Sequence, residues 1–130
     1  MAATYLDSSA LVKLAVDEPE SAALRRHLRR RRTLVSSALA RPEVLRALLP
    51  AGPDAVAAGR QVLALCDLVR INDATLNRAA ALLPHELRTL DAIHVATALR
   101  LEDELGAFVT YDGRMADAAR AVGVRVVAPG

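Results

Sequence analysis

Short apolar runs of four or five residues alternate along this chain with longer stretches of helical spacing, and this alternation limits the fold more than any other feature. The apolar runs are predicted strands, and they lie at 3–6, 33–37, 68–71, 107–111 and 124–128. Strands that are separated by helices pair in parallel through crossover connections. The sequence therefore predicts an α/β fold, a three-layer α/β/α sandwich in which helices flank a central parallel sheet of four to five strands.

The predicted helices fill the spaces between the strands, at 8–16, 19–31, 38–49, 54–66, 73–83, 89–105 and 113–122. Pro42 implies that its helix either starts close by or is kinked there. No repeat, low-complexity tract or linker divides the chain, so residues 1–130 are expected to form a single domain. Apolar residues make up 53% of the chain and aromatic residues only 2%, so the core is expected to be aliphatic and rich in alanine.

Cysteine content and the N-terminal sequence bear on the compartment. Cys66 is the only cysteine, which excludes a disulfide within the chain and a cysteine-based zinc site, and fits a reducing cytoplasm. The opening "MAATYLD" has no basic region and does not resemble a signal peptide. No apolar run approaches the roughly 20 residues of a membrane helix. A cytoplasmic protein without a membrane partner is expected.

The basic residues are almost all arginines, and they are unevenly distributed. The net charge is only +2, and Lys13 is the one lysine among 17 basic residues. The segment "RRHLRRRR" holds six arginines, at positions 25, 26, 29, 30, 31 and 32. Such a cluster can attract the phosphates of a nucleic acid. A solvated helix end, or an arginine preference inherited from a GC-rich genome, is the favoured explanation.

Four acidic residues fall at comparable places in the predicted fold. Asp7 and Asp112 directly follow predicted strands, Glu43 lies early in a helix that follows a strand, and Asp91 lies in the first turn of the helix opened by Thr89. Open α/β sheets bind ligands beyond the carboxyl ends of their strands. Singly, each acid has a structural explanation as a helix cap, a partner of the helix dipole or an exposed helix residue.

Taken together, the four acids indicate a metal site. Three of them adjoin segments that should be buried, where unpaired carboxylates are costly and raise one another's pKa values. Divalent cations remove this repulsion, and oxygen ligands without cysteine or clustered histidine favour Mg²⁺ or Mn²⁺ over zinc. A carboxylate site with two such metals is typical of phosphodiester hydrolysis. The arginines would then attract an RNA or DNA backbone.

Four segments in this order resemble the PIN-domain family, and in particular the VapC-type toxins of bacterial toxin–antitoxin pairs. They are "YLDSSALVKL", "SSALARPEVLRAL", "LRTLDAIHVATALRL" and "FVTYDGRMADAARAVGVRVVAP", and together they span nearly the whole chain. The resemblance implies a PIN-like sandwich and a Mg²⁺- or Mn²⁺-dependent endoribonuclease. Such a toxin inhibits translation and growth until its antitoxin neutralises it.

The resemblance also implies the roles of particular residues. The catalytic, metal-binding acids would be Asp7, Asp91 and Asp112, and Glu43 would complete the quartet, directly or through a bound water. Ser8 and Thr110 would orient these carboxylates. Pro42, immediately before Glu43, departs from the family pattern and could change the aim of the glutamate.

The partners implied by the resemblance are an RNA substrate, a small protein and a second copy of the chain. The RNA could be a transfer RNA, a ribosomal RNA or a messenger RNA. A VapB-type antitoxin would lie in the active-site groove, often with a basic side chain reaching the acids. Toxins of this type usually form homodimers.

Three other polar residues have structural interpretations, and two other functions are less compatible with the sequence. His94, three residues after Asp91, could be a metal ligand or a base, but a packed or surface histidine is favoured; Asp117 is interpreted as helix surface, and Asp73 as a helix cap. A phospho-acceptor receiver domain would need an acid pair after the first strand and a lysine near the last, and both are missing. A PIN-like module that only binds RNA or protein remains the alternative, although the intact acid quartet argues against it.

Overall fold

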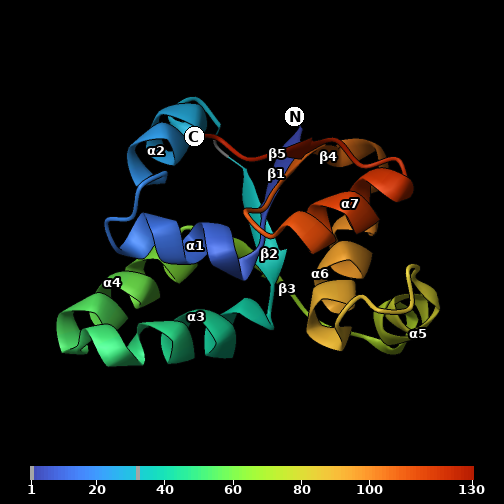
Figure 1. The fold of residues 1–130 in the computed structure, drawn as a ribbon, viewed down its shortest axis with the longest axis horizontal. Helices are drawn as coiled ribbons and strands as arrows, with labels where there is room; N and C mark the ends of the chain where they lie inside the picture. Colours follow the sequence, from blue (N-terminus) through green and yellow to red (C-terminus); the bar gives the residue numbers. More distant parts are fainter. Residues whose placement is uncertain (1, 32) are drawn as a thin grey trace.

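A five-stranded parallel sheet runs through the middle of the protein in the computed structural model, which describes residues 2–31 and 33–130 (Figure 1). The order of the strands across the sheet is β3-β2-β1-β4-β5, and every neighbouring pair is parallel. Their bounds are β1 Ala3–Leu6, β2 Leu34–Ser37, β3 Asp67–Val69, β4 Leu105–Val109 and β5 Val126–Val127. The predicted α/β class, and the upper end of the predicted strand number, are confirmed.

Helices cover both faces of this sheet, which gives the three predicted layers. In Figure 1, α1 to α4 lie on one side of the strands and α5 to α7 on the other. Their bounds are α1 Ser8–Ala15, α2 Ser21–Leu28, α3 Ala40–Leu48, α4 Pro53–Ala64, α5 Asp73–Ala81, α6 Thr89–Leu99 and α7 Gly113–Ala121, with short 3₁₀ helices at Leu49–Ala51 and Glu102–Glu104. None of the helices in the described part of the chain is long and apolar enough to cross a membrane.

Strand β1 is the point at which the direction of strand addition reverses. The chain first adds β2 and β3 on one side of β1, and later adds β4 and β5 on the other side. The pairs Tyr5–Val35 and Leu6–Val109 fix the register on its two sides. In open parallel sheets the crevice beyond the carboxyl ends at such a switch point is the usual ligand site. Asp7, which follows β1, stands in this crevice.

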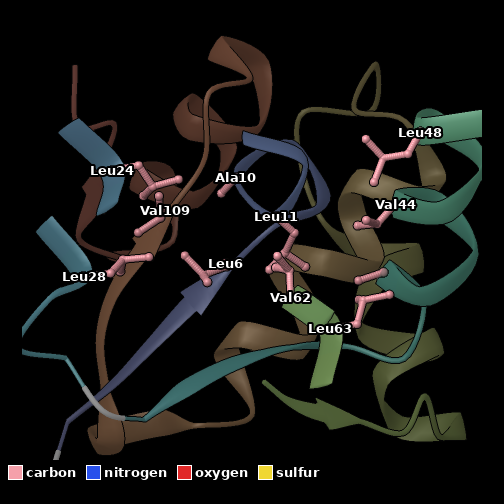
Figure 2. Packing of buried hydrophobic residues seen from close by; sticks show 11 residues of the cluster. Leu6, Ala10, Leu11, Leu24, Leu28, Val44, Leu48, Val62, Leu63 and Val109 are labelled. Atoms are coloured by element: carbon pink, nitrogen blue, oxygen red, sulfur yellow. The ribbon is translucent and has the colours of Figure 1, made fainter. Parts of the chain in front are cut away.

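The core on one face of the sheet is aliphatic, as the composition predicts. Figure 2 shows it packed between β1, β4 and the helices α1 to α4, with side chains including Leu6, Leu11, Val44 and Leu63. The other face contains the two buried aromatic rings, Tyr5 and Phe108, which stack with centroids 5.0 Å apart. Because Tyr5 and Leu6 point to opposite faces, both sides of β1 are buried, as is typical of a central parallel strand.

Several boundaries differ from the predicted ones. The predicted helix at 89–105 ends as α6 at Leu99, and the chain then passes through a 3₁₀ turn in which Glu102 has a φ of +49°, outside helical geometry. Strand β4 therefore starts at Leu105 and ends at Val109, before Thr110. Helix α3 starts at Ala40, so Pro42 lies in its first turn, where a missing N–H costs little and causes no kink.

The arginine cluster lies away from the carboxyl ends of the strands. Five of its members are described and exposed, at 25, 26 and 29–31, in α2 and in the turn that leads into β2; Arg32 lies outside the described residues. Since this turn leads into the amino end of β2, the cluster lies near the amino ends of the strands, whereas Asp7 lies at their carboxyl ends.

Candidate active site

Asp7 is a buried carboxylate held by three donors. It caps the N-terminus of α1, and its Oδ1 accepts hydrogen bonds from the Ala10 backbone N–H (3.0 Å) and the Ser9 hydroxyl (2.7 Å). Its Oδ2 accepts one from Thr110 Oγ1 at 2.5 Å. Burial raises the pKa of Asp7 above its ordinary value, and the hydrogen bonds from Thr110, Ser9 and Ala10 oppose this rise only in part. The carboxylate is thus well ordered but lacks a compensating charge.

Asp112 is linked to Asp7 through one hydroxyl. Thr110 Oγ1, which donates to Asp7, also accepts a hydrogen bond from the Asp112 backbone N–H at 3.1 Å. The Asp112 side chain caps α7, where its Oδ1 accepts from the backbone N–H groups of Arg114 (2.9 Å) and Met115 (3.1 Å). The structure thus places Thr110 behind both acids, which fits the orienting role predicted for it.

Asp91 lies in the first turn of α6 and is partly buried. Burial raises its pKa most, the negative charge of Asp112 raises it further and that of Glu43 adds a smaller rise, while His94 and Arg88 lower it only in part. The hydrogen bonds among the described residues include none to its carboxylate, so it is the least constrained of the four acids.

Glu43 reaches the site from the first turn of α3, in spite of Pro42 beside it. Its Oε1 accepts a hydrogen bond from the Ser8 hydroxyl (2.6 Å) and lies 2.7 Å from His94 Nε2. Burial raises the pKa of Glu43, but the hydrogen bonds from His94 and Ser8 outweigh that effect, so its pKa lies below the ordinary value. Glu43 is therefore a carboxylate in a carboxylate-rich site that stays ionised at neutral pH.

His94 is buried, with 1% of its surface exposed, and both of its ring nitrogens have partners. Nδ1 lies 2.7 Å from the Tyr5 hydroxyl, and Nε2 faces Glu43. The favoured interpretation of a packed histidine agrees with this arrangement, in which neither ring nitrogen is free to bind a metal. The sequence does not predict the contact of His94 with Tyr5, although Tyr5 is one of only two tyrosines in the chain and lies two residues before Asp7.

The four predicted acids converge on one cleft of about 90 Å³ at the carboxyl ends of the strands. Each comes from a different part of the chain, so only the fold brings them together. The lining residues are Asp7, Ser8, Ser9, Glu43, Asp91, His94, Asp112 and Met115.

Asp117 and Asp73, for which the sequence predicts structural roles, lie outside the cleft. Asp117 is exposed and forms an ion pair with Arg120 (3.6 Å), in agreement with its interpretation as helix surface. The prediction that Asp73 caps α5 is wrong. The cap is Asn72, whose side chain accepts from the Thr75 N–H at 2.9 Å, and Asp73 occupies the first turn.

The donor set of the cleft fits a hard divalent cation. Among the described residues, neither Asp7, Asp91 nor Asp112 forms an ion pair with lysine or arginine. Two of these acids have raised pKa values, which a cation in the cleft would lower. No three Asp, Glu, His or Cys side chains of the described ranges converge closely enough to enclose a metal by themselves. A Mg²⁺ ion in this cleft would therefore be held in part through its bound waters.

Comparison with known proteins agrees with this fold and site. The PIN domain family matches residues 4–121. Ribonuclease VapC46 of Mycobacterium tuberculosis is 63% identical over 129 residues, which cover 99% of each chain. Ribonuclease VapC35 of the same species is 45% identical and covers 97% of this chain and 96% of its own.

A solved structure gives the same result for the fold. The crystal structure of Mycobacterium tuberculosis VapC20, a sarcin-ricin loop cleaving toxin, superimposes with a TM-score of 0.76 over 97% of this chain and 99% of its own, at 18% sequence identity. That likeness concerns the fold alone, whereas the family match and the two ribonucleases extend over the sequence that carries the acids. The chain belongs to the PIN domain family, as a member of its VapC branch.

Proposed function

We propose that this protein is a metal-dependent endoribonuclease and the toxin of a toxin–antitoxin pair. It would hydrolyse RNA phosphodiester bonds in the acidic cleft with Mg²⁺, or with Mn²⁺ as a substitute, and so inhibit translation and growth. The observation that carries the proposal is the convergence of four carboxylates, from four separate elements, on one cleft at the switch point of the sheet. The names of VapC46 and VapC35 as ribonucleases support the substrate class.

In this proposal Asp7, Asp91 and Asp112 bind the metal, in part through its bound waters. A divalent ion there would acidify a bound water and stabilise charge on the phosphate. Thr110 and the caps of α1 and α7 hold Asp7 and Asp112 in place before any ligand arrives. Asp91, which lacks such constraints, can adjust to the ion.

Glu43 would act at the edge of the metal site. Its Oε1 is occupied by Ser8 and His94, which leaves Oε2 to bind the metal or to orient a metal-bound water. Its lowered pKa keeps it ionised, so that it can accept a hydrogen bond from that water.

The partners follow from the charge of the cleft. A VapB-type antitoxin that places a basic side chain among these acids would replace the metal's charge and block the substrate. The RNA, whether transfer, ribosomal or messenger, would be held in the cleft through a phosphate bound to the metal, because the arginine cluster borders the amino ends of the strands. We also propose a cytoplasmic homodimer, as is usual for toxins of this type.

The test is cleavage of total cellular RNA by the purified protein, free of antitoxin, with Mg²⁺, with Mn²⁺ and with EDTA. Asp7→Asn and Asp91→Asn should abolish cleavage. Asp73→Asn is a matched control, because Asp73 is also a first-turn aspartate of a helix but is exposed and outside the cleft. Discrete fragments that require the metal and both cleft acids are expected.

Two results would contradict the proposal. Cleavage that persists in EDTA or in Asp7→Asn would mean that the cleft does not carry the reaction. No cleavage of any cellular RNA by the folded wild type would favour the alternative of a silent RNA- or protein-binding module.

A further inference from the structure

A chain of hydrogen bonds runs from the core to the acidic cleft. The Tyr5 hydroxyl lies 2.7 Å from His94 Nδ1, and His94 Nε2 lies 2.7 Å from Glu43 Oε1. The three residues come from β1, α6 and α3. Tyr5 and His94 are buried, whereas Glu43 is partly exposed at the cleft. The chain therefore connects a fixed point inside the protein to a partly exposed acid at the site.

The direction of each hydrogen bond follows from the groups involved. An ionised Glu43 can only accept, so Nε2 of His94 must carry a hydrogen and donate it. Burial raises the pKa of Tyr5, so its hydroxyl keeps its proton and can donate to Nδ1. A neutral imidazole protonated at Nε2 satisfies both contacts. Tyr5 itself is fixed, because its ring stacks on Phe108 at an interplanar angle of 12°.

Glu43 lacks the backbone hydrogen bonds that hold Asp7 and Asp112. Asp7 and Asp112 have short side chains whose oxygens accept backbone hydrogen bonds from the helices that they cap. Glu43 has a longer side chain and no such backbone bond among the described residues, and only Ser8 and His94 hold its Oε1. Of these two donors, only His94 has a hydrogen bond to a further buried side chain, that of Tyr5.

We propose that Tyr5 and His94 are positioning residues for Glu43: Tyr5 holds the ring of His94 in one orientation, and His94 fixes one carboxylate oxygen of Glu43 so that the other faces the metal or its water. This inference rests on the proposed function. It assigns to His94 neither metal binding nor direct proton transfer to the substrate. Removing a residue that hydrogen-bonds to a metal ligand typically lowers the metal affinity by about 10–100-fold.

The first test uses the metal-free protein. The ring ¹⁵N NMR signals of His94 should show a protonated Nε2 and an unprotonated Nδ1 in the wild type. Tyr5→Phe should shift the Nδ1 signal, because that nitrogen loses its hydrogen-bond donor, while the signals of His27 and His85 stay unchanged. A wild-type ring that is protonated at Nδ1 would overturn the proposal.

The second test measures the affinity for Mn²⁺ alone, by calorimetry, in a double-variant cycle. Tyr5→Phe should weaken Mn²⁺ binding about tenfold in the wild type but less than about twofold in Glu43→Gln, because the effect of Tyr5 passes through Glu43. Tyr111→Phe is the matched control, since it removes the other tyrosine hydroxyl, which donates to the Pro129 carbonyl at 2.5 Å. His94→Gln, which keeps an N–H donor, should retain more affinity than His94→Leu.

The outcomes separate the inference from the function on which it rests. If Tyr5→Phe lowers the Mn²⁺ affinity equally in the wild type and in Glu43→Gln, Tyr5 has a general structural role and the proposal is overturned. The proposal is also overturned if Glu43→Gln weakens Mn²⁺ binding but Tyr5→Phe in the wild type does not. If Glu43→Gln itself leaves Mn²⁺ affinity and RNA cleavage unchanged, the role of Glu43 in the proposed function fails instead. Thermal unfolding of each variant confirms that folded proteins are compared.

Discussion

The hydroxyl of Thr110 makes two hydrogen bonds at the site, and their removal has an energy that can be worked out from the structure. Thr110 is 1% exposed, donates to the Asp7 carboxylate at 2.5 Å and accepts from the Asp112 N–H at 3.1 Å. Thr110→Val replaces the hydroxyl by a methyl group of similar size, so no large cavity forms. A hydrogen bond to a charged group contributes about 1.5–3 kcal/mol and a neutral one about 0.5–1.5 kcal/mol. We expect a loss of about 2–4 kcal/mol in the free energy of unfolding.

Two matched variants isolate the contribution of the charged acceptor. Thr97 is also buried, but its hydroxyl donates to the neutral Ile93 carbonyl at 2.6 Å. Thr97→Val should therefore cost only about 0.5–1.5 kcal/mol. Thr110→Ser keeps the hydroxyl and loses one methyl group, which is worth about 0.8 kcal/mol.

The measurement is urea unfolding followed by far-ultraviolet circular dichroism, at neutral pH and without divalent metal. The loss in Thr110→Val should exceed the loss in Thr97→Val. It should also shrink as the pH falls, because the Thr110 hydrogen bond stabilises the ionised form of Asp7, which takes up a proton on acidification. Equal losses in the two valine variants, or a loss that does not change with pH, would refute the assignment of Asp7 as a buried, ionised acceptor.

Two further predictions concern charge. Because burial holds the pKa of Asp7 above its value in the unfolded chain, its contribution to stability is complete below the unfolded pKa and is lost as the pH rises through the folded pKa. As the pH rises through this range, the melting temperature of the metal-free wild type should therefore fall, and that of Asp7→Asn should fall less. Equal changes in the two melting temperatures with pH would contradict this. The second prediction is that Arg25→Gln with Arg29→Gln leaves cleavage of a short RNA unchanged, since both arginines lie across the sheet from the cleft, and reduces the salt dependence of binding to a long RNA. Slower cleavage of the short RNA would place the cluster at the site.

The acids could be located from the sequence because their positions depend on local features. Asp7 and Asp112 directly follow strand-like runs, and parallel pairing brings the carboxyl ends of strands to one edge. Glu43 and Asp91 sit in first turns of helices that leave this edge. The placements of Asp7, Asp112 and Glu43 need only the alternation of strands and helices, whereas Asp91 lies in a helix that follows another helix.

The support behind the acids could not be predicted, because it depends on contacts between distant segments. Tyr5 and His94 are 89 residues apart, and their contact depends on how α6 packs against β1. The sequence also did not show that Asn72, and not Asp73, caps α5. Both residue types cap helices well, so the sequence does not distinguish a start at one from a start at the next.

Two of the four acids combine a structural role with the proposed chemical one. Asp7 caps α1 and Asp112 caps α7, so each carboxylate stabilises the helix that positions it. Alanine would remove the cap, at about 1 kcal/mol, as well as the charge. Asparagine caps a helix about as well as aspartate but carries no charge for a cation. A loss of function in Asp7→Asn therefore reports on the chemistry of the cleft, whereas the same loss in Asp7→Ala mixes that chemistry with the stability of α1.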